Sequence, residues 1–325
     1  MSYPKEIIAE ANAITSRRRH EAEEIQKARH AEIAEKLPDV LKYEAQLAQT
    51  GIAVVKSLTM GENAKKYIKE LSELNLRIQS LIKKELESAG YPSDYLETPY
   101  TCKACSDTGF KDGVACYCRK KLLSELNVAR LEKCSPAKYC RFSDFDVNLY
   151  DDEGGDGYSP RQRMSDVLEY CKCYADDFGE SSCSLYMYGA TGLGKTHLSL
   201  AIANEAARKG FNVLYYSAQN LFSALEKEKF TSGAGTTEAD VEDCDLLIID
   251  DLGSEYSTRF TVSALYNIIN TRLNLSKPSI ISTNLSITEL EKTYDQRIAS
   301  RIIGNYQYLL FEGRDIRQIK SNVEE

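Results

Sequence analysis

Several features are scarce in this chain of 325 residues, and their absence excludes classes of protein. No apolar run approaches the roughly 20 residues that a transmembrane helix needs, so we expect no membrane partner. The first 19 residues are polar and lack the apolar stretch of a signal peptide, which favours a cytoplasmic protein. The net charge is −8, so no overall positive field attracts nucleic acid, and DNA contact would need a local patch. Tryptophan is absent, which decides nothing about function.

Cysteine, in contrast, is well represented, with ten residues. In a cytoplasmic chain these thiols more often serve as metal ligands or lie buried than form disulfides. Hydrophobic residues make up 42% of the chain and charged residues 28%, which is typical of folded proteins. A chain of this length has room for two or more domains.

One glycine-rich stretch organises the rest of the chain. It fits the phosphate-binding pattern G-x-x-x-x-G-K-S/T, known as the P-loop or Walker A motif. The apolar run before it predicts a short buried strand, and the residues after it predict a helix that ends near Gly210. A strand followed by this motif and a helix is the context that a P-loop requires. The expected cofactor-binding residues are Gly189, Ala190, Thr191, Gly192, Leu193, Gly194, Lys195, Thr196 and His197.

The residue types of this motif suit a nucleotide. Glycines let the backbone turn tightly so that its N–H groups face phosphate oxygens, and the helix N-terminus adds partial positive charge. We expect Lys195 to reach the β- and γ-phosphates of ATP and Thr196 to bind Mg²⁺ through its hydroxyl.

A second motif, residues 245–251, predicts a buried strand that ends in two carboxylates. Asp250 fits the Walker B aspartate that holds Mg²⁺. Asp251 stands where a general base would polarise the attacking water, although capping of the next segment is an alternative.

Polar and basic residues follow later in the chain. Asn284 ends another expected strand and suits orientation of the attacking water, with a simple strand-end cap as the alternative. Arginines at positions 297, 301, 314 and 317 follow, and any one of them taken alone is more often a surface ion-pair partner. Their order after the P-loop, residue 250 and Asn284 favours a role in stabilising transition-state charge.

Four cysteines, Cys102, Cys105, Cys116 and Cys118, lie within a short segment with a glycine-containing hairpin between the pairs. Four thiolates at this spacing predict a tetrahedral Zn²⁺ site that closes a small module without its own core. An iron–sulfur cluster and unligated thiols are the alternatives. Cys134 and Cys140 follow closely enough to replace one ligand.

The remaining chain divides into two kinds of region. Residues 1 to about 90 show helical periodicity in three stretches. From about residue 161 onward, strands alternate with helices, which predicts an α/β fold with a parallel sheet covered by helices.

The motifs together resemble the AAA+ ATPases of the DnaC/DnaI type, the bacterial replicative helicase loaders. The resemblance covers about residues 142–320 and rests on the two nucleotide motifs and on residues 266–273, 279–286, 297–304 and 311–317. The four-cysteine segment is similar to the zinc module that precedes the ATPase in DnaI-like members, although it has no histidine among its expected ligands.

The resemblance implies a division into residues 1–95, a helical region that contacts the helicase, residues 96–135, a zinc module with a linker helix, and residues 136–325, the AAA+ domain. It also implies roles for single residues. Asn284 corresponds to sensor 1, Arg301 to an arginine finger that acts on a neighbouring subunit, and Arg317 to sensor 2. Arg297 is a weaker candidate for the finger. Asp251 stands where many AAA+ proteins have glutamate.

The implied function is ATP-dependent loading of the hexameric replicative DNA helicase onto single-stranded DNA, with ATP, Mg²⁺ and Zn²⁺ as cofactors. The implied partners are the helicase, single-stranded DNA and further copies of the chain upon ATP binding. Lys227, Lys229 and Phe230 are candidates for DNA contact, because basic and aromatic side chains together suit single strands. An IstB-type transposition helper and a nucleotide-gated scaffold with little turnover are the alternatives.

Overall fold

The computed structural model describes residues 3–57, 64–153, 157–179, 181–230 and 236–321. These residues form two compact units, one made of residues 1–9 and 120–325 and the other of residues 10–119. Among the described residues, no helix is both long enough and apolar enough to cross a membrane.

A five-stranded parallel sheet forms the centre of the larger unit, with the strand order β4-β5-β6-β3-β7. The expected parallel α/β sheet is therefore confirmed. β3 comes first along the chain and lies between β6 and β7, which both come later. In a parallel sheet all carboxyl ends share one edge, so the segments that follow β3, β5 and β6 meet there. The strands are β3 (Ser184–Gly189), β4 (Val213–Ser217), β5 (Leu246–Leu252), β6 (Ser279–Thr283) and β7 (Tyr306–Phe311).

Strand β5 shows why the sheet is covered on both faces. Its side chains alternate, so that Leu246 and Ile248 join one apolar cluster while Leu247 and Ile249 join another. All four are fully buried. A strand that is buried on both faces appears in the sequence as a continuous apolar run, which is how this segment appears.

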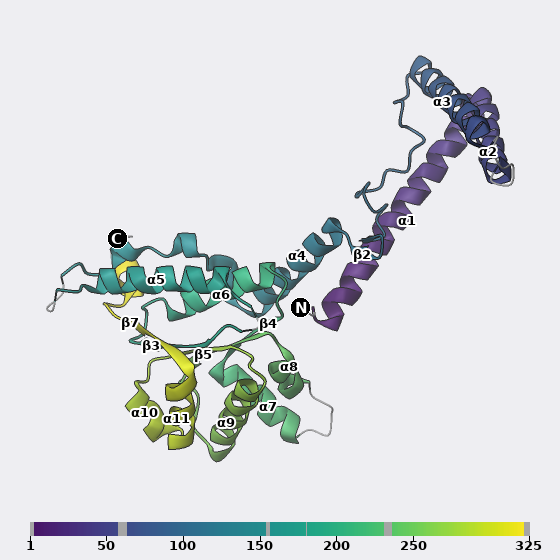
Figure 1. The fold of residues 1–325 in the computed structure, drawn as a ribbon. Coiled ribbons are helices and arrows are strands. Elements are labelled where there is room, and N and C mark those ends of the chain that lie inside the picture. Colours follow the sequence, from purple (N-terminus) through teal and green to yellow (C-terminus); the bar gives the residue numbers. More distant parts are fainter. Residues whose placement is uncertain (1–2, 58–63, 154–156, 180, 231–235, 322–325) are drawn as a thin grey trace. The chain divides into compact units, whose positions relative to one another are not determined.

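Helices cover the two faces of the sheet (Figure 1). α5 and α6 lie on one face, and α7, α9, α10 and α11 lie on the other. Several helices begin with side-chain caps; in α10, Ser286 and Glu289 form a capping box. The helices of this unit are α4 (Tyr117–Cys134, shared with the other unit), α5 (Pro160–Asp176), α6 (Lys195–Arg208), α7 (Ala218–Phe230), α8 (Thr237–Asp243), α9 (Arg259–Asn274), α10 (Ile287–Thr293), α11 (Gln296–Asn305) and α12 (Ile316–Ser321), with short 3-10 helices at Pro136–Tyr139, Phe142–Asp144 and Val147–Leu149.

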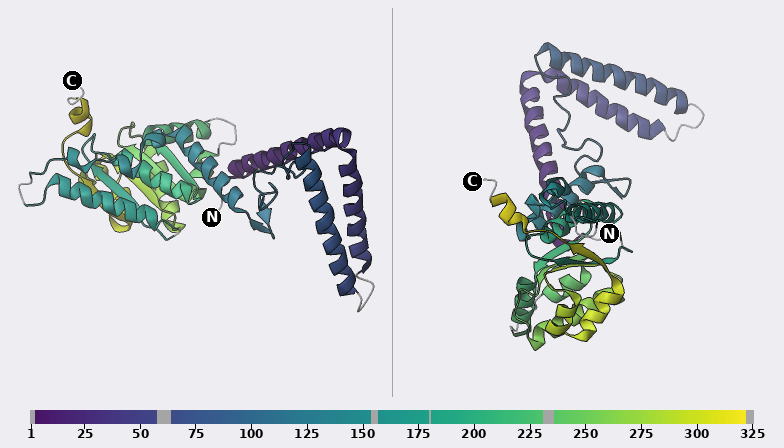
Figure 2. Two further views of the ribbon diagram at one scale, coloured as in Figure 1. Left: turned by 90° about the horizontal axis from the view of Figure 1, so that it is seen from above. Right: turned by 90° about the vertical axis from the view of Figure 1, so that its left-hand side faces the viewer.

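The smaller unit contains the expected N-terminal helices, α1 (Lys5–Lys36, whose residues 5–9 belong to the larger unit), α2 (Pro38–Ser57) and α3 (Ala64–Ser88). α2 and α3 lie side by side as an antiparallel pair (Figure 2). Ile33, Val40 and Leu86 are buried together and join the three helices. The unit also contains a short antiparallel hairpin, β1 (Phe110–Lys111) and β2 (Val114–Ala115).

Candidate nucleotide and metal sites

The P-loop lies between β3 and α6, as expected, and its glycines are required by the geometry. Gly194 caps α6 with a φ of 87°, and Gly192 has a φ of 76°. A Cβ atom on Gly192 would lie 1.8 Å from Oδ1 of Asp315, so any larger residue would displace the Asp315 side chain. The backbone N–H of Ile316 donates to the carbonyl of Gly192 at 3.1 Å. The segment before α12 therefore packs directly on the phosphate-binding loop.

The ammonium group of Lys195 lies at the centre of this loop. It donates to the carbonyls of Gly189 and Ala190 at 2.7 and 2.6 Å and to Oδ1 of Asn284 at 2.7 Å. Burial lowers the pKa of Lys195 to about 8; the nearby carboxylates of Asp251 and Asp250 oppose this shift, and Arg317 adds to it. A buried lysine whose partners are all neutral gains stability from an added anion, which suits a phosphate.

The carboxylate of Asp250 lies next to Thr196. The hydroxyl of Thr196 donates to its two oxygens at 2.9 and 3.0 Å. Two residues that the sequence motifs did not indicate also donate to it, Tyr215 through its phenol at 2.8 Å and Ser282 through its hydroxyl. A hydroxyl beside a buried carboxylate is an oxygen donor set that suits Mg²⁺. Thr196 and Asp250 therefore fit the metal position that the sequence predicts.

Asp251 and Asn284 also meet at this edge. Asp251 has a φ of 57°, in the left-handed region, where the pairing of β5 with β6 shifts register. Its exposed carboxylate accepts a hydrogen bond from Nδ2 of Asn284 at 3.2 Å. Because Oδ1 of the same amide accepts from Lys195, Asn284 connects the lysine with Asp251. This arrangement can orient a water molecule next to the position of a terminal phosphate.

These residues line one cavity of about 370 Å³. Arg317, on α12, reaches it, and so does His197, whose Nε2 lies 2.8 Å from the carbonyl of Arg141. The cavity also has a wall that the sequence did not predict, made of residues 144–150. In that wall Phe145 lies 5.8 Å from the ring of Tyr150, and Tyr150 donates to the carbonyl of Leu193 at 2.9 Å. A short linker without a motif gave no sequence signal for this wall.

Arg301 lies elsewhere in the same unit and does not line this cavity. On α11, its guanidinium stacks on the ring of Tyr266 at 4.4 Å and donates to Asn270 at 3.1 and 3.0 Å. Arg297 pairs with Asp295 at 2.9 Å and lies 5.3 Å from the same ring. A finger that completes a neighbouring subunit's site has no need to face its own nucleotide, so this position is compatible with the predicted role.

The candidates for DNA contact lie at the end of α7. Phe230 is exposed over 76% of its surface, and the ammonium of Lys229 lies 5.0 Å from the ring centre of Phe260. These side chains are accessible, and their role stays a prediction.

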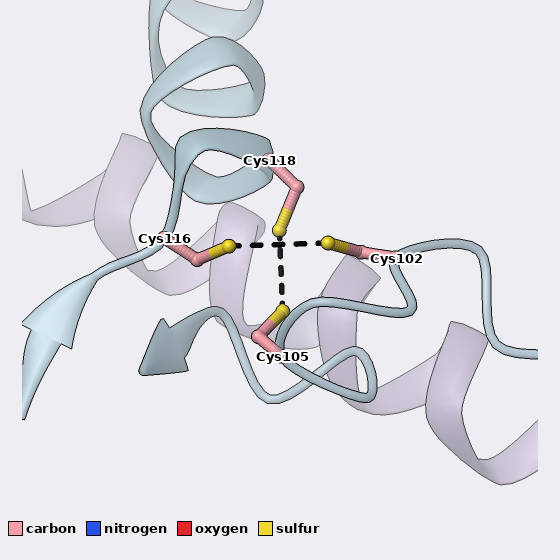
Figure 3. Close-up of side chains that lie close together, drawn as sticks. All are labelled: Cys102, Cys105, Cys116 and Cys118. Carbon is pink, nitrogen blue, oxygen red and sulfur yellow. Dashed lines mark hydrogen bonds between the residues drawn. The ribbon is translucent and has the colours of Figure 1, made fainter. Parts of the chain in front are cut away.

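The four expected zinc ligands converge in the smaller unit (Figure 3). Their sulfur atoms all lie within 4.8 Å of one another, with 3.8 Å between Cys102 and Cys116 and 3.4 Å between Cys105 and Cys118. Zn–S bonds of about 2.3 Å place tetrahedral sulfurs about 3.8 Å apart, so the group fits Zn²⁺. Cys140 takes no part, since its thiol donates to the carbonyl of Pro136 at 3.6 Å in the other unit. The side chain of Cys134 lies outside the described residues.

The segment around these cysteines has almost no apolar interior. From residue 101 to 119, the buried residues are Cys105, Asp107, Gly109, Cys116 and Arg119. Asp107 accepts from the backbone N–H groups of Thr101 and Cys102, both at 2.8 Å, and so fixes the approach to the first ligand. In the hairpin, Asp112 and Gly113 both have positive φ, which is typical of a type I′ turn. A metal ion would supply the cohesion that a core supplies elsewhere.

Comparisons with known proteins agree with the geometry of the larger unit. Residues 162–308 match the family described as IstB-like ATP binding protein. The replicative helicase loader DnaC of Escherichia coli is 29% identical over 150 residues, which are 45% of this chain and 60% of that protein. The DnaC loader of Buchnera aphidicola (Acyrthosiphon pisum) is 30% identical over 162 residues, 48% of this chain and 65% of that protein. The chain thus spans less than two thirds of the length of these relatives.

A relative from a phage-like element has broader coverage at lower identity. The PBSX protein XkdC of Bacillus subtilis is 27% identical over 228 residues, 66% of this chain and 82% of that protein. Among solved structures, the crystal structure of DnaI has a TM-score of 0.46 and 22% identity, covering 54% of this chain and 92% of that one. The resemblance to DnaC-type AAA+ helicase loaders that the motifs indicated is confirmed, and it lies in the half of the chain that carries the P-loop.

Proposed function

We propose that this protein is an ATPase that loads the replicative DNA helicase onto single-stranded DNA when replication begins. The main support is that one cavity is lined by Lys195, Thr196, Asp250, Asn284 and Arg317. The DnaC relatives, which are named as replicative helicase loaders, support the choice of helicase as partner.

Each residue of the cavity has a role in this proposal. Mg²⁺-ATP supplies the phosphoanhydride bond whose hydrolysis drives the cycle. Lys195 places its charge against the β- and γ-phosphates, and Thr196 with Asp250 holds the metal. Asn284 orients the attacking water, and Asp251 accepts its proton. Because aspartate is shorter than glutamate, Asp251 reaches less far, and we expect slow turnover that depends on the assembled state.

We further propose that ATP binding assembles copies of the chain into a ring or spiral. In such an assembly Arg301 stabilises the transition-state charge on the neighbouring subunit's nucleotide, and Arg317 contacts the nucleotide of its own subunit. Residues 1–95 and the zinc module within 96–135 bind the hexameric helicase, and the AAA+ domain, 136–325, contacts single-stranded DNA.

A loading assay on circular single-stranded DNA tests the function. The replicative helicase from the same source is mixed with the circle, the protein and ATP, and helicase retained on the circle is measured. We expect retention to require the protein and ATP and to be lost in Lys195→Ala. Equal retention of the helicase without the protein would show that the protein does not load this helicase. ATP turnover with and without the DNA separates an active ATPase from a scaffold.

A second candidate has its own support, because the matched family model is named for IstB-like proteins. An IstB-type helper would bind duplex DNA and a transposase. Co-purification of the full chain with helicase or with transposase distinguishes the two functions. The four-cysteine segment and the long helical region favour the loader.

A further inference from the structure

The Walker B carboxylate is surrounded by hydroxyl groups that the nucleotide motifs do not include. Asp250 is 6% exposed, and three hydroxyls donate to it. Thr196 belongs to the P-loop, whereas Tyr215 and Ser282 belong to the sheet. A buried carboxylate is stable only when its oxygens have donors, so these two sheet residues satisfy a group that is expensive to bury.

The two hydroxyls reach the carboxylate from opposite sides. Tyr215 lies on β4 and Ser282 lies on β6, the two strands that flank β5. The phenol of Tyr215 donates to Oδ2 of Asp250 at 2.8 Å, and the hydroxyl of Ser282 donates to Oδ1. Each oxygen therefore has its own donor from a rigid strand, and the plane of the carboxylate is fixed without help from Thr196.

Ser282 also fixes the neighbouring residue. Its oxygen accepts a hydrogen bond from the backbone N–H of Asp251 at 2.9 Å. Asp251 has a φ of 57°, which is unfavourable for a residue with a side chain, so its backbone needs such a contact to hold it. One buried serine thus orients both acidic residues, the first through its side chain and the second through its backbone.

We propose that Tyr215 and Ser282 are positioning residues that hold Asp250, and through Ser282 also Asp251, in the orientation that binds the divalent metal. This inference rests on the proposed binding of Mg²⁺-ATP. With a metal bound by Thr196 and Asp250, the two strand hydroxyls would keep the carboxylate in place. Groups that orient a metal ligand typically change metal affinity about 10- to 100-fold when they are removed.

The contact of Tyr215 with Asp250 is made by its phenol hydroxyl. Phenylalanine at this position would keep the ring and remove only the donor.

The test compares Tyr215→Phe and Ser282→Ala with the intact chain. A fluorescent ATP analogue is titrated in EDTA, and the bound complex is then titrated with Mg²⁺ or Mn²⁺. We expect about 10-fold more metal to be required in each variant. Analogue affinity in EDTA should not change, because the P-loop contacts remain. Ser282→Thr, which keeps a hydroxyl, should restore part of the metal affinity.

Two matched controls remove buried hydroxyls away from Asp250. Tyr174→Phe loses a donor to the carbonyl of Cys183, and Ser184→Ala loses the acceptor for the N–H of Ser279. Thermal unfolding of all variants shows whether a loss is only structural. An unchanged metal requirement in Tyr215→Phe and Ser282→Ala, or an equal loss in EDTA, overturns the inference. An intact chain that binds no ATP analogue under any condition contradicts the proposed function itself, and the inference with it.

Discussion

The two compact units are stabilised by different physical means. The larger unit has two apolar clusters, one on each face of its sheet, and most of its strand residues are buried. The segment from residue 101 to 119 in the other unit buries two cysteines, an aspartate, an arginine and a glycine, and no aliphatic or aromatic side chain. The larger unit thus has an apolar core, whereas the cysteine segment depends on what its four thiols bind.

Ligands are therefore expected to act differently in the two units. In the larger unit, hydrogen bonds already hold Asp250, Lys195 and Asn284 in position. A nucleotide would therefore bind to a preformed site. In the cysteine segment, metal binding and local folding are one event.

Removal of the metal should unfold the cysteine segment, residues 101–119, and leave the larger unit folded. We expect one zinc ion per chain by elemental analysis, and none in a variant with Cys102→Ser and Cys105→Ser. Structural zinc supplies about 10–16 kcal/mol of apparent binding free energy, so residues 101–119 should lose hydrogen-exchange protection almost completely. ATP binding should persist. Cys173→Ser, which changes an exposed thiol, is the control.

Iron in place of zinc, with visible absorption, would favour the alternative cluster. Full protection of the segment in the double variant would show that the thiols do not need a ligand.

Loss of the finger should abolish turnover and spare binding. Arg301→Ala should lower ATP turnover of the assembled protein by about 10³-fold, the effect typical of arginine fingers. Mixing it with Lys195→Ala should restore part of the activity, because intact sites form between the two variants. Tyr266→Phe removes a partner of Arg301 and is the control for local packing. Failure of the mixture to recover activity, with both variants assembled, would contradict action between subunits.

Loss of the P-loop lysine should affect the larger unit alone. Lys195→Ala should lower turnover by about 100-fold, the usual cost of removing one donor at a developing charge. The zinc content and the protection of residues 101–119 should not change. Lys277→Ala, which removes a lysine bound to the carbonyls of Glu242 and Asp243, provides the control. Loss of zinc in Lys195→Ala would show that the units depend on each other.

The pH dependence gives the smallest effect. The pKa of Lys195 is lowered to about 8 from 10.5, so between these values the unfolded chain holds more protons than the folded one. The contribution of Lys195 to the free energy of unfolding therefore rises with pH from about 8 to 10.5. Below pH 8 the buried ammonium destabilises the folded chain. Lys195→Met should be more stable than the intact chain at pH 7, and its advantage should shrink by pH 10. ATP affinity of the intact chain should fall above pH 8. Denaturant unfolding and ATP titration across this range check both, and a constant difference between the two proteins would refute the sign.

The sequence predicted the sheet and most of the cavity, because their signals are local. A strand followed by a glycine-rich loop, or an apolar run that ends in Asp250, is readable in a few residues. The sequence did not predict the roles of Tyr215 and Ser282, because a hydroxyl within a strand belongs to no motif. The two hydroxyls reach Asp250 only because β4 and β6 flank β5 in the sheet. The sequence also did not predict strand β7, because Tyr306 begins it directly after α11 without an intervening turn. The capping box of Ser286 and Glu289 would have indicated α10.

The most direct test of the loader function is size-exclusion chromatography with light scattering of the full chain mixed with the replicative helicase. It is run with ATP and without it, for the intact protein and for the variant with Cys102→Ser and Cys105→Ser. We expect a discrete complex for the intact protein, stabilised by ATP, and a weakened complex for the variant although it still binds ATP. No complex in either nucleotide condition would contradict the loader function and direct attention to a transposase partner.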